Sequence, residues 1–278
     1  MSLSQHARQA LVNHIFKEAY TPVTPLYLCL CTAHPSYYDT GSTITETVYT
    51  NYTRKLISSS FFGAASSRKV VQASDAVFAT SESGDPSTIK SYAICDASSS
   101  GNLLAYGNFS SEWELTSGTT PKIVAGEIEI VISNAVTTGI TNFTAHKILD
   151  MLFRNVAWTS PKDNLYFGLT TATISDGSTM STITECSGNS YARKNVLSSA
   201  INYADDSSNT SNNAVIAFVT PTGTWGLVTS MFATTDASGT AGDLLFFDNT
   251  NIVDCTPDSG DTIQFLISDF EFRTYSTG

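Results

Sequence analysis

Pairs of carboxylates are the residues of this sequence whose spacing best suits catalysis. Glu112 and Glu114 flank Trp113, and Glu127 and Glu129 show the same spacing of two residues. On a β-strand this spacing places both carboxylates on one face, and a glycosidase needs only two carboxyl groups beside its substrate. Neither pair recurs in the second half of the chain, although the two halves are related. We therefore interpret all four as solvated strand residues and predict no catalytic residue.

The sequence also contains weak candidates for a metal site. Asp205, Ser207 and Asn209 have the spacing of the first ligands of an EF-hand loop, but the glycine and the final glutamate of such a loop are missing. Cys29 and Cys31 lie two residues apart, with neither the spacing nor the nearby histidines of a zinc site. We expect a turn in the first case and small buried hydrophobic residues in the second. No metal and no cofactor is predicted.

Motifs that carry enzymatic chemistry do not occur in the chain. It has no G-x-S-x-G, Walker A or G-x-G-x-x-G sequence, and these are the usual signatures of acyl transfer, nucleotide hydrolysis and dinucleotide binding. Its four histidines form no metal-binding pair, and its five cysteines do not suggest a disulfide framework. We predict that the protein is not an enzyme and that it folds in a reducing cytoplasm.

Charge and composition argue against two classes of partner. The chain has 278 residues, with 14 Lys and Arg against 25 Asp and Glu, which gives a net charge of −11. Nucleic-acid binding needs clustered Lys and Arg, and a membrane span needs roughly 18 or more consecutive apolar residues, which no segment approaches. Charged residues make up 14 % of the chain and hydrophobic residues 41 %. Together with abundant Ser, Thr, Asn and Gly, this composition favours strands and turns around a substantial core.

The chain contains an internal duplication, in which segments of the first half recur in the second at a nearly constant offset. Ordered matches run through both halves, and the offset drifts only at loops, which is hard to obtain by chance. The clearest matches pair residues 26–33 with 165–172, 43–46 with 182–185, 52–55 with 191–194, 96–98 with 236–238 and 103–106 with 244–247. We predict two similar domains, at residues 1–138 and 139–278.

Each half is expected to begin with a short α-helix and to continue as about six short strands. Apolar residues recur at helical spacing from Leu11 to Ala19 and again from Ile148 to Val156, and Thr144 is placed to cap the second helix. The expected strands are residues 26–32, 52–61, 69–79, 89–95, 102–109 and 122–132, then 165–171, 191–201, 214–219, 226–234, 243–248 and 262–272. Residues 134–143 are expected to link the halves. The predicted fold class is mainly β: two tandem antiparallel β-sandwich or barrel-like domains, each preceded by one short α-helix.

Aromatic residues supply the candidate binding surfaces. Adjacent residues on a strand face opposite sides, so each Phe-Phe pair would place one ring in the core and one outward, unless both faces of the sheet are covered. Outward aromatic residues often mark protein interfaces, and they can also stack on a sugar. The candidate interface aromatics are Tyr37, Tyr38, Trp113, Trp225 and Phe247.

The repeated pattern resembles a known family. Its parts are an N-terminal helix, the run Leu26-Tyr27-Leu28-x-Leu30-x-Thr32-Ala33-x-Pro35, a Thr-x-x-Glu turn, a Tyr-x-Arg strand, the run Phe218-x-x-Pro221-x-Gly223-x-Trp225-Gly226, and Asn102-Leu103-Leu104-x-Tyr106-Gly107. In this order they are similar to the small β-sandwich virion proteins of tailed bacteriophages that are often labelled tail fibre proteins. The resemblance covers essentially the whole chain, in two copies.

The resemblance implies a non-enzymatic assembly protein of a phage particle, made in the cytoplasm of the host bacterium. Such a protein would dock on other virion proteins of the tail, the neck or collar, or the head, in several copies or as a homo-oligomer. Two tandem domains could span two equivalent sites or gain avidity. The alternative is a module that recognises a host surface glycan through its aromatic residues.

Overall fold

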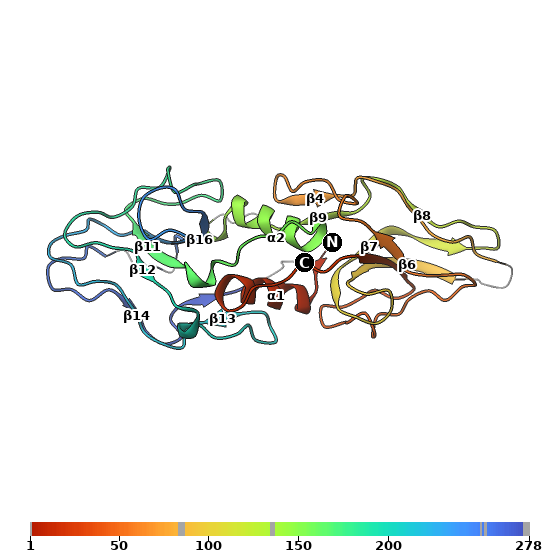
Figure 1. Cartoon of the computed structure of the whole chain (residues 1–278), viewed down its shortest axis with the longest axis horizontal. Helices are drawn as coiled ribbons and strands as arrows, with labels where there is room; N and C mark the ends of the chain where they lie inside the picture. Colours follow the sequence, from red (N-terminus) through yellow and green to blue (C-terminus); the bar gives the residue numbers. More distant parts are fainter. Residues whose placement is uncertain (1, 83–86, 134–136, 251, 253–254, 275–278) are drawn as a thin grey trace.

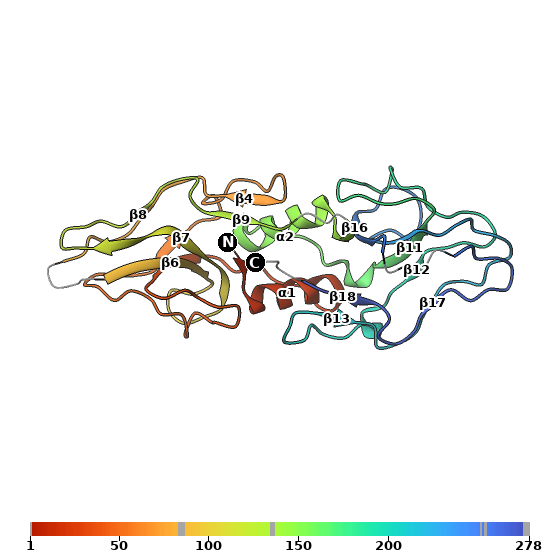
Figure 2. The same cartoon turned by 180° about the vertical axis from the view of Figure 1, so that it is seen from behind.

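A computed structural model describes residues 2–82, 87–133, 137–250, 252 and 255–274. The molecule is elongated, with β-strands at both ends and two α-helices side by side at its centre (Figures 1 and 2). Each half of the chain forms one end, so the duplication seen in the sequence is also a division in space.

A five-stranded antiparallel sheet forms the frame of the first repeat. Its strands lie in the order β1 (Ser2–Leu3), β7 (Leu103–Leu115), β6 (Ser87–Cys95), β2 (Leu26–Cys31) and β3 (Lys55–Ile57). Two short ribbons pair β4 (Lys69–Val71) with β9 (Glu129–Val131) and β5 (Ala76–Val77) with β8 (Lys122–Ile123). Leu28 and Ile94 of the sheet share a buried core with Val70 and Ile130 of the ribbons. This packing of a sheet against ribbons is a β-sandwich.

The second repeat has the same topology. Its sheet follows the order β10 (Thr138–Ile140), β16 (Leu244–Asp248), β15 (Ser230–Thr234), β11 (Tyr166–Thr170) and β12 (Lys194–Asn195). Its ribbons pair β13 (Thr210–Ser211) with β18 (Glu271–Phe272) and β14 (Ile216–Ala217) with β17 (Gln264–Phe265). The predicted mainly β fold with two tandem antiparallel domains is therefore confirmed.

Both faces of each five-stranded sheet are covered. On the face away from the ribbons, the loop after β2 places Ile44 over a small apolar cluster, and the loop after β11 places Ile174 and Met180 over another. Phe246 lies in the main core of the second repeat and Phe247 in the small cluster behind it. Of the two alternatives for this pair, the structure has the covered sheet: the loop lies over the second face, so neither ring points outward.

The two helices begin at equivalent points of the repeats. Helix α1 (Gln5–Phe16) is capped by Ser4, and α2 (Asn142–Arg154) is capped by Thr141 rather than by the predicted Thr144. Each capping hydroxyl also donates to a carbonyl of its own sheet, Ser4 to Leu103 and Thr141 to Leu244. The prediction of a linker at 134–143 is wrong in part, since residues 138–140 form β10 and α2 begins at Asn142. Residues 134–136 lie outside the described part of the chain.

The helices end in the opposite repeats. Val12, Ile15 and Phe16 of α1 belong to the core of the second repeat. Leu149, Leu152 and Phe153 of α2 belong to the core of the first. The two repeats therefore exchange the C-terminal halves of their helices at the centre of the molecule (Figure 1).

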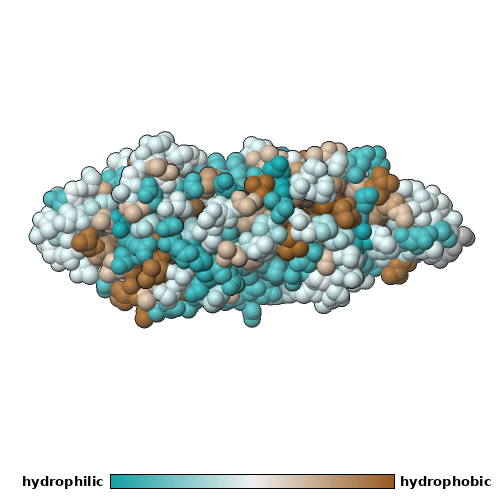
Figure 3. Space-filling model, viewed as in Figure 1, coloured by the Kyte–Doolittle hydropathy of each residue, from teal (hydrophilic) through white to brown (hydrophobic). Residues whose placement is uncertain are grey.

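The 3-10 helices η1 (Pro161–Asp163) and η2 (Ser198–Ala200) both belong to the second repeat. On the face seen in Figure 3, hydrophobic residues form small, separate patches among hydrophilic ones. Within the described ranges, no helix has the length and apolar character that crossing a membrane requires.

Candidate functional site

A buried ion pair lies where the loops at one edge of the first sheet meet. Glu46 follows the loop after β2, and Arg54 precedes β3. Arg54 donates to Glu46 Oε1 from Nε at 2.9 Å and from Nη2 at 2.6 Å, while the Tyr52 hydroxyl donates to Oε2 at 2.9 Å. The backbone amide of Leu30 in turn donates to the Tyr52 hydroxyl at 3.0 Å, which ties the network to β2.

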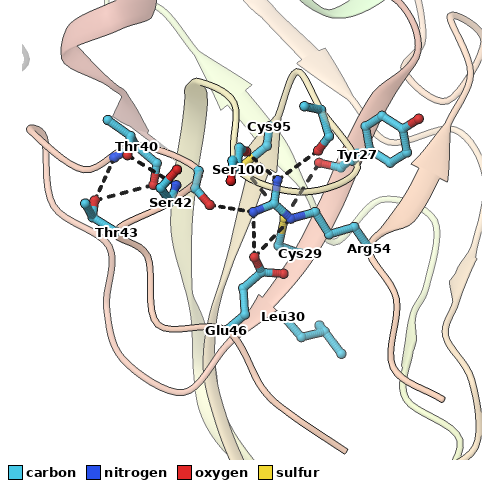
Figure 4. A network of polar contacts seen from close by, with 12 residues as sticks. Tyr27, Cys29, Leu30, Thr40, Ser42, Thr43, Glu46, Arg54, Cys95 and Ser100 are labelled. Atoms are coloured by element: carbon cyan, nitrogen blue, oxygen red, sulfur yellow. Dashed lines mark hydrogen bonds and ion pairs between the residues drawn. The ribbon is translucent and has the colours of Figure 1, made fainter. Parts of the chain in front are cut away.

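The guanidinium of Arg54 also holds two loops by their backbone carbonyls. Nη1 donates to Ala97 O and to Ser100 O at 2.8 Å, and Nη2 donates to Gly41 O at 2.6 Å (Figure 4). The first two carbonyls lie in the turn between β6 and β7, and the third lies in the loop between β2 and β3. One charged side chain therefore fixes the loop that covers the second face of the sheet.

The electrostatics of this site favour the charged form of arginine and the neutral forms of its neighbours. Burial alone would lower the pKa of Arg54, but the hydrogen bonds and charge of Glu46 raise it overall. Burial is the main reason why the pKa of Tyr52 is raised, and burial likewise raises the pKa of the Cys29 and Cys31 thiols. Tyr52 and the two thiols are therefore protonated at neutral pH.

The second repeat builds the same network from equivalent residues. Arg193 donates to Glu185 Oε1 from Nε at 2.8 Å and to Oε2 from Nη2 at 2.7 Å, and the Tyr191 hydroxyl donates to Oε1 at 3.0 Å. Its remaining donors reach Asp236 O at 2.8 Å and Gly239 O at 2.6 Å. Because the carboxylate accepts from arginine and tyrosine in both repeats, the arrangement suits loop fixation rather than proton transfer.

The buried cysteines of the first repeat line the same region. Cys29 and Cys31 are fully buried, with Cys95 beside them and 3.8 Å between the sulfurs of Cys29 and Cys95. They pack with Ile44 in the cluster behind the sheet. The prediction that Cys29 and Cys31 are small buried hydrophobic residues is confirmed.

Of the carboxylates considered for catalysis, Glu112, Glu114 and Glu129 lie on strands, whereas Glu127 lies in the exposed bend between β8 and β9, so the expectation of a strand is wrong for Glu127. Glu112 pairs with Lys90 at 3.3 Å, and Glu129 pairs with Lys69 at 2.7 Å. Glu114 accepts a hydrogen bond from the Thr88 hydroxyl at 3.0 Å. These are solvated cross-strand contacts, as the sequence indicates.

The Asp205 loop is a turn. Asp205 Oδ1 accepts from the amides of Ser207 and Asn209 at 2.9 and 2.8 Å, which is the geometry of an Asx turn. Among the described residues, no three or more His, Cys, Asp and Glu side chains gather in a way that could hold a metal ion.

The five candidate interface aromatics lie in different environments. Tyr38 is exposed, at 67 %, and packs edge-on against the half-buried Tyr37. Trp113 is half-buried and stacks on Phe109 with 4.1 Å between ring centroids. Trp225 and Phe247 are buried, at 3 % and 1 %, and cannot contribute to an exposed surface. Trp225 instead packs edge-on against Tyr191 of the arginine network.

Tyr37 contributes to a contact between the repeats. Its hydroxyl lies 2.6 Å from the Ser208 hydroxyl of the second repeat, and the Arg8 guanidinium lies over its ring at 5.0 Å. Arg8 in turn donates to Thr274 O at 2.7 Å. The structure thus assigns Tyr37 to the centre of the molecule.

Arg68 is a functional residue that the sequence does not reveal. It is 3 % exposed and donates to Ser133 O at 2.6 Å and to Ile140 O at 3.1 Å. It therefore holds the connection between the repeats on both sides of residues 134–136. Burial lowers its pKa, and the nearby carboxylate of Asp176, at 3.9 Å, acts in the opposite direction. A lone arginine in a serine-rich loop carries no sequence signal for this role.

Comparison with known proteins gives the family. A protein-family model described as the podophage GP4 fiber I protein gp80 matches residues 2–131 and, again, residues 139–273. No curated protein matches the chain significantly. The two matched regions coincide with the two repeats of the fold and cover most of the chain, as the resemblance to phage tail fibre proteins predicts. The chain belongs to the family of the podophage GP4 fiber I protein gp80, and it contains two tandem copies of the region that the family model describes.

Proposed function

We propose that this chain is a non-enzymatic structural component of a phage fibre, attached to the tail or collar, that docks on other virion proteins through its β-sandwich surfaces. The observation that carries the proposal is the double match to a phage fibre family. The polar side chains agree with it, because Glu46 and Glu185 serve to hold loops rather than to face a cleft. The chain's two domains are residues 1–138 and 139–278, with the C-terminal halves of the helices exchanged between them.

Location in the particle tests the proposal directly. Purified particles of the phage that encodes this chain would be digested and quantified by mass spectrometry against a known capsid protein, and labelled with gold-conjugated antibody to the chain. We expect several copies for each particle, with the label on a tail or collar fibre. Absence of the chain from purified particles would overturn the proposal, and label on the head would replace the fibre with a head-associated role.

A second candidate function rests on Tyr38, whose ring is exposed and held by Tyr37. An aromatic ring presented in this way can stack on a sugar of the host surface. A glycan array probed with the intact protein and with Tyr38→Ala tests this role. Binding that Tyr38→Ala abolishes, while a Tyr203→Ala control at another exposed ring retains it, would establish glycan recognition.

A further inference from the structure

The exchanged ends of the helices occupy equivalent places in opposite repeats. Counting from the capping residues Ser4 and Thr141, the same positions of each helix enter the other core. The equivalent pairs are Val12 and Leu149, Ile15 and Leu152, and Phe16 and Phe153. All six side chains are at most 2 % exposed, so each core is complete only with the helix of its neighbour.

Polar contacts across the centre are also matched. Asn13 Oδ1 accepts a hydrogen bond from the amide of Ala204 at 2.9 Å, and Asp150 Oδ1 accepts one from the amide of Ala65 at 2.9 Å. Asn13 and Asp150 hold the same position in their helices, and Ala65 and Ala204 are equivalent positions of the two repeats. The contact is therefore made twice, once in each direction.

A cation at the C-terminal end of each helix, Lys17 after α1 and Arg154 in α2, shows the same reciprocal arrangement. Lys17 Nζ donates to Ile201 O at 2.7 Å, and Arg154 Nε donates to Phe62 O at 3.2 Å. Phe62 and Ile201 are again equivalent positions of the two repeats. An approximate twofold relation therefore links the side chains of the exchange as well as the sheets.

Each core has a socket, which is the site that receives the helix end of the other repeat. The two sockets differ in the rings that line them. Phe16 enters a group of three rings, Phe246, Phe270 and Phe272, with ring centroids 5.2–5.9 Å from its own. Among the described residues, Phe153 meets one ring, that of Phe62, at 5.7 Å. Since the α1 end carries Val and Ile where the α2 end carries two Leu, each socket is shaped for the helix it holds.

We propose that a repeat of this kind completes its core only with the helix of a second repeat, so that this chain is a covalently joined pair with the arrangement of a helix-exchanged dimer. The partner that each socket fits is another copy of the same fold. Unlike sockets favour pairing of the first repeat with the second over pairing of either with itself. The proposal concerns the assembly of the chain and holds whatever the chain attaches to.

Cutting the connection tests the proposal in the full chain. A protease recognition sequence would be inserted between Ser133 and Thr137, both of which are exposed, and the folded protein cleaved to completion. We expect the two fragments to travel together in size-exclusion chromatography with light scattering, at the mass of the uncut chain. Separation into two monomers that each retain a cooperative melting transition would overturn the proposal.

Matched variants show whether the helices are responsible for the association. Val12→Ala removes two methyl groups from a side chain of the first repeat that lies in the core of the second. In the cleaved protein, we expect Val12→Ala to raise the dissociation constant of the fragments about tenfold, and Val48→Ala, at an exposed valine of the first repeat, to leave it unchanged. An unchanged dissociation constant in Val12→Ala would assign the association to other contacts and contradict the helix-exchange proposal.

Refolding tests the selectivity of the sockets. The fragments would be separated in urea and refolded either together or apart. We expect the melting transition of the uncut chain to return only when the fragments are refolded together. Stable homodimers formed by either fragment alone would overturn the part of the proposal that concerns unlike sockets.

Discussion

The arginine network is the residue-scale feature that both copies retain. In each repeat a buried arginine binds one glutamate and the carbonyls of the turn between two strands of the sheet, and in the first repeat it also binds the carbonyl of Gly41 in a second loop. A buried ion pair is not in itself a strong source of stability, but removal of one partner leaves a buried charge without compensation. The network therefore acts mainly to fix one arrangement of the loops behind the sheet.

Glu46→Gln is expected to destabilise the protein by about 3 kcal/mol, since the neutral amide leaves the Arg54 charge buried without its counter-ion. Urea unfolding at neutral pH measures the change. The control is Glu112→Gln, which removes an exposed partner of Lys90 and is expected to cost less than about 1 kcal/mol. Equal losses in the two variants would show that the network is no more important than a surface pair.

His14 gives the molecule a pH dependence at its centre. It lies on α1, is fully buried, and accepts a hydrogen bond at Nδ1 from the amide of Tyr20 at 2.9 Å. Its ring lies 4.9 Å from Trp158 of the second repeat. Burial lowers its pKa from 6.5 to about 4, so it is neutral in the folded protein at pH 7.

A histidine whose pKa is lowered on folding stabilises the protein above pH 6.5, and this contribution is lost as the pH falls towards 4. The loss amounts to about 3 kcal/mol. In His14→Asn, the side-chain oxygen can replace Nδ1 as acceptor, so the fall in unfolding free energy between pH 7 and pH 4 should be smaller by about that amount. His34→Asn, at an exposed position, should keep the slope of the parent protein. If the unfolding free energy of His14→Asn falls between pH 7 and pH 4 as much as that of the parent protein, this account is contradicted.

At the scale of elements, the two sheets show how the copies diverged without loss of packing. In the first repeat Cys29 of β2 lies opposite Ala93 of β6, and in the second Gly168 of β11 lies opposite Phe232 of β15. A Cβ atom added at Gly168 would clash with the Phe232 ring. Two small side chains in the first repeat therefore correspond to a glycine and a large ring in the second.

Gly168→Cys alone is expected to cost about 1–3 kcal/mol, because it overpacks the site. Phe232→Ala alone should cost about 3–5 kcal/mol through the cavity that it leaves. The double variant recreates the pair of the first repeat, so its loss should be clearly smaller than the sum of the two. A double-mutant cycle in urea measures this coupling, and simple additivity would contradict it. The control for overpacking is Gly63→Ala, where the added Cβ meets nothing closer than 3.7 Å, so the loss seen with Gly168→Cys should not appear.

Exchange of the helix ends makes single rings important for both repeats. Phe16→Ala is expected to cost about 3–5 kcal/mol, because its ring is fully buried among rings of the second repeat. Tyr38→Ala, at an exposed ring, should change the unfolding free energy by less than about 0.5 kcal/mol. Thermal and urea unfolding measure both variants. A small effect of Phe16→Ala would show that the socket closes without the helix.

Several elements could be predicted from the sequence because they depend on local pattern and repetition. The runs at 26–31 and 166–170 are mostly apolar and recur, and both form inner strands of their sheets. The exchange could not be predicted, because an apolar face such as that of Val12 and Phe16 does not specify which of two similar cores it enters. Burial of Phe247 depends on Ile174 and Met180 of a distant loop, and the role of Arg68 depends on carbonyls far along the chain. These contacts are set by tertiary structure rather than by local pattern.

At the scale of the whole molecule, the repeats could be joined either by the existing connection or by a link between the two ends of the chain. Thr274, the last described residue, accepts a hydrogen bond from Arg8 near the start of the chain, so both ends of the described chain lie at the centre. Because the repeats are related by an approximate twofold axis, a link between the two ends of the chain would have a geometry similar to that of the existing connection.

A circular permutant tests this equivalence. The original ends would be joined by about ten Gly and Ser residues, which span roughly 17 Å, and the chain opened between Ser133 and Thr137. We expect a folded monomer that melts within a few degrees of the parent protein. A permutant opened between Ser98 and Ser99, in the turn that Arg54 holds, should melt at a clearly lower temperature. Failure of the first permutant with survival of the second would contradict the expected symmetry.

The helix exchange also sets the order in which the chain can fold during synthesis. The core of the first repeat includes Leu152 and Phe153, which leave the ribosome after all of the strands that they complete. Until then, the first sheet has an open socket, and Phe16 has no partner rings before residues 246–272 follow. Domains that fold as independent units can form one after the other as they emerge. Here the first core cannot close before residue 153 has emerged, and the second cannot close before residue 272, so nascent chains that stop before residue 153 expose apolar surface.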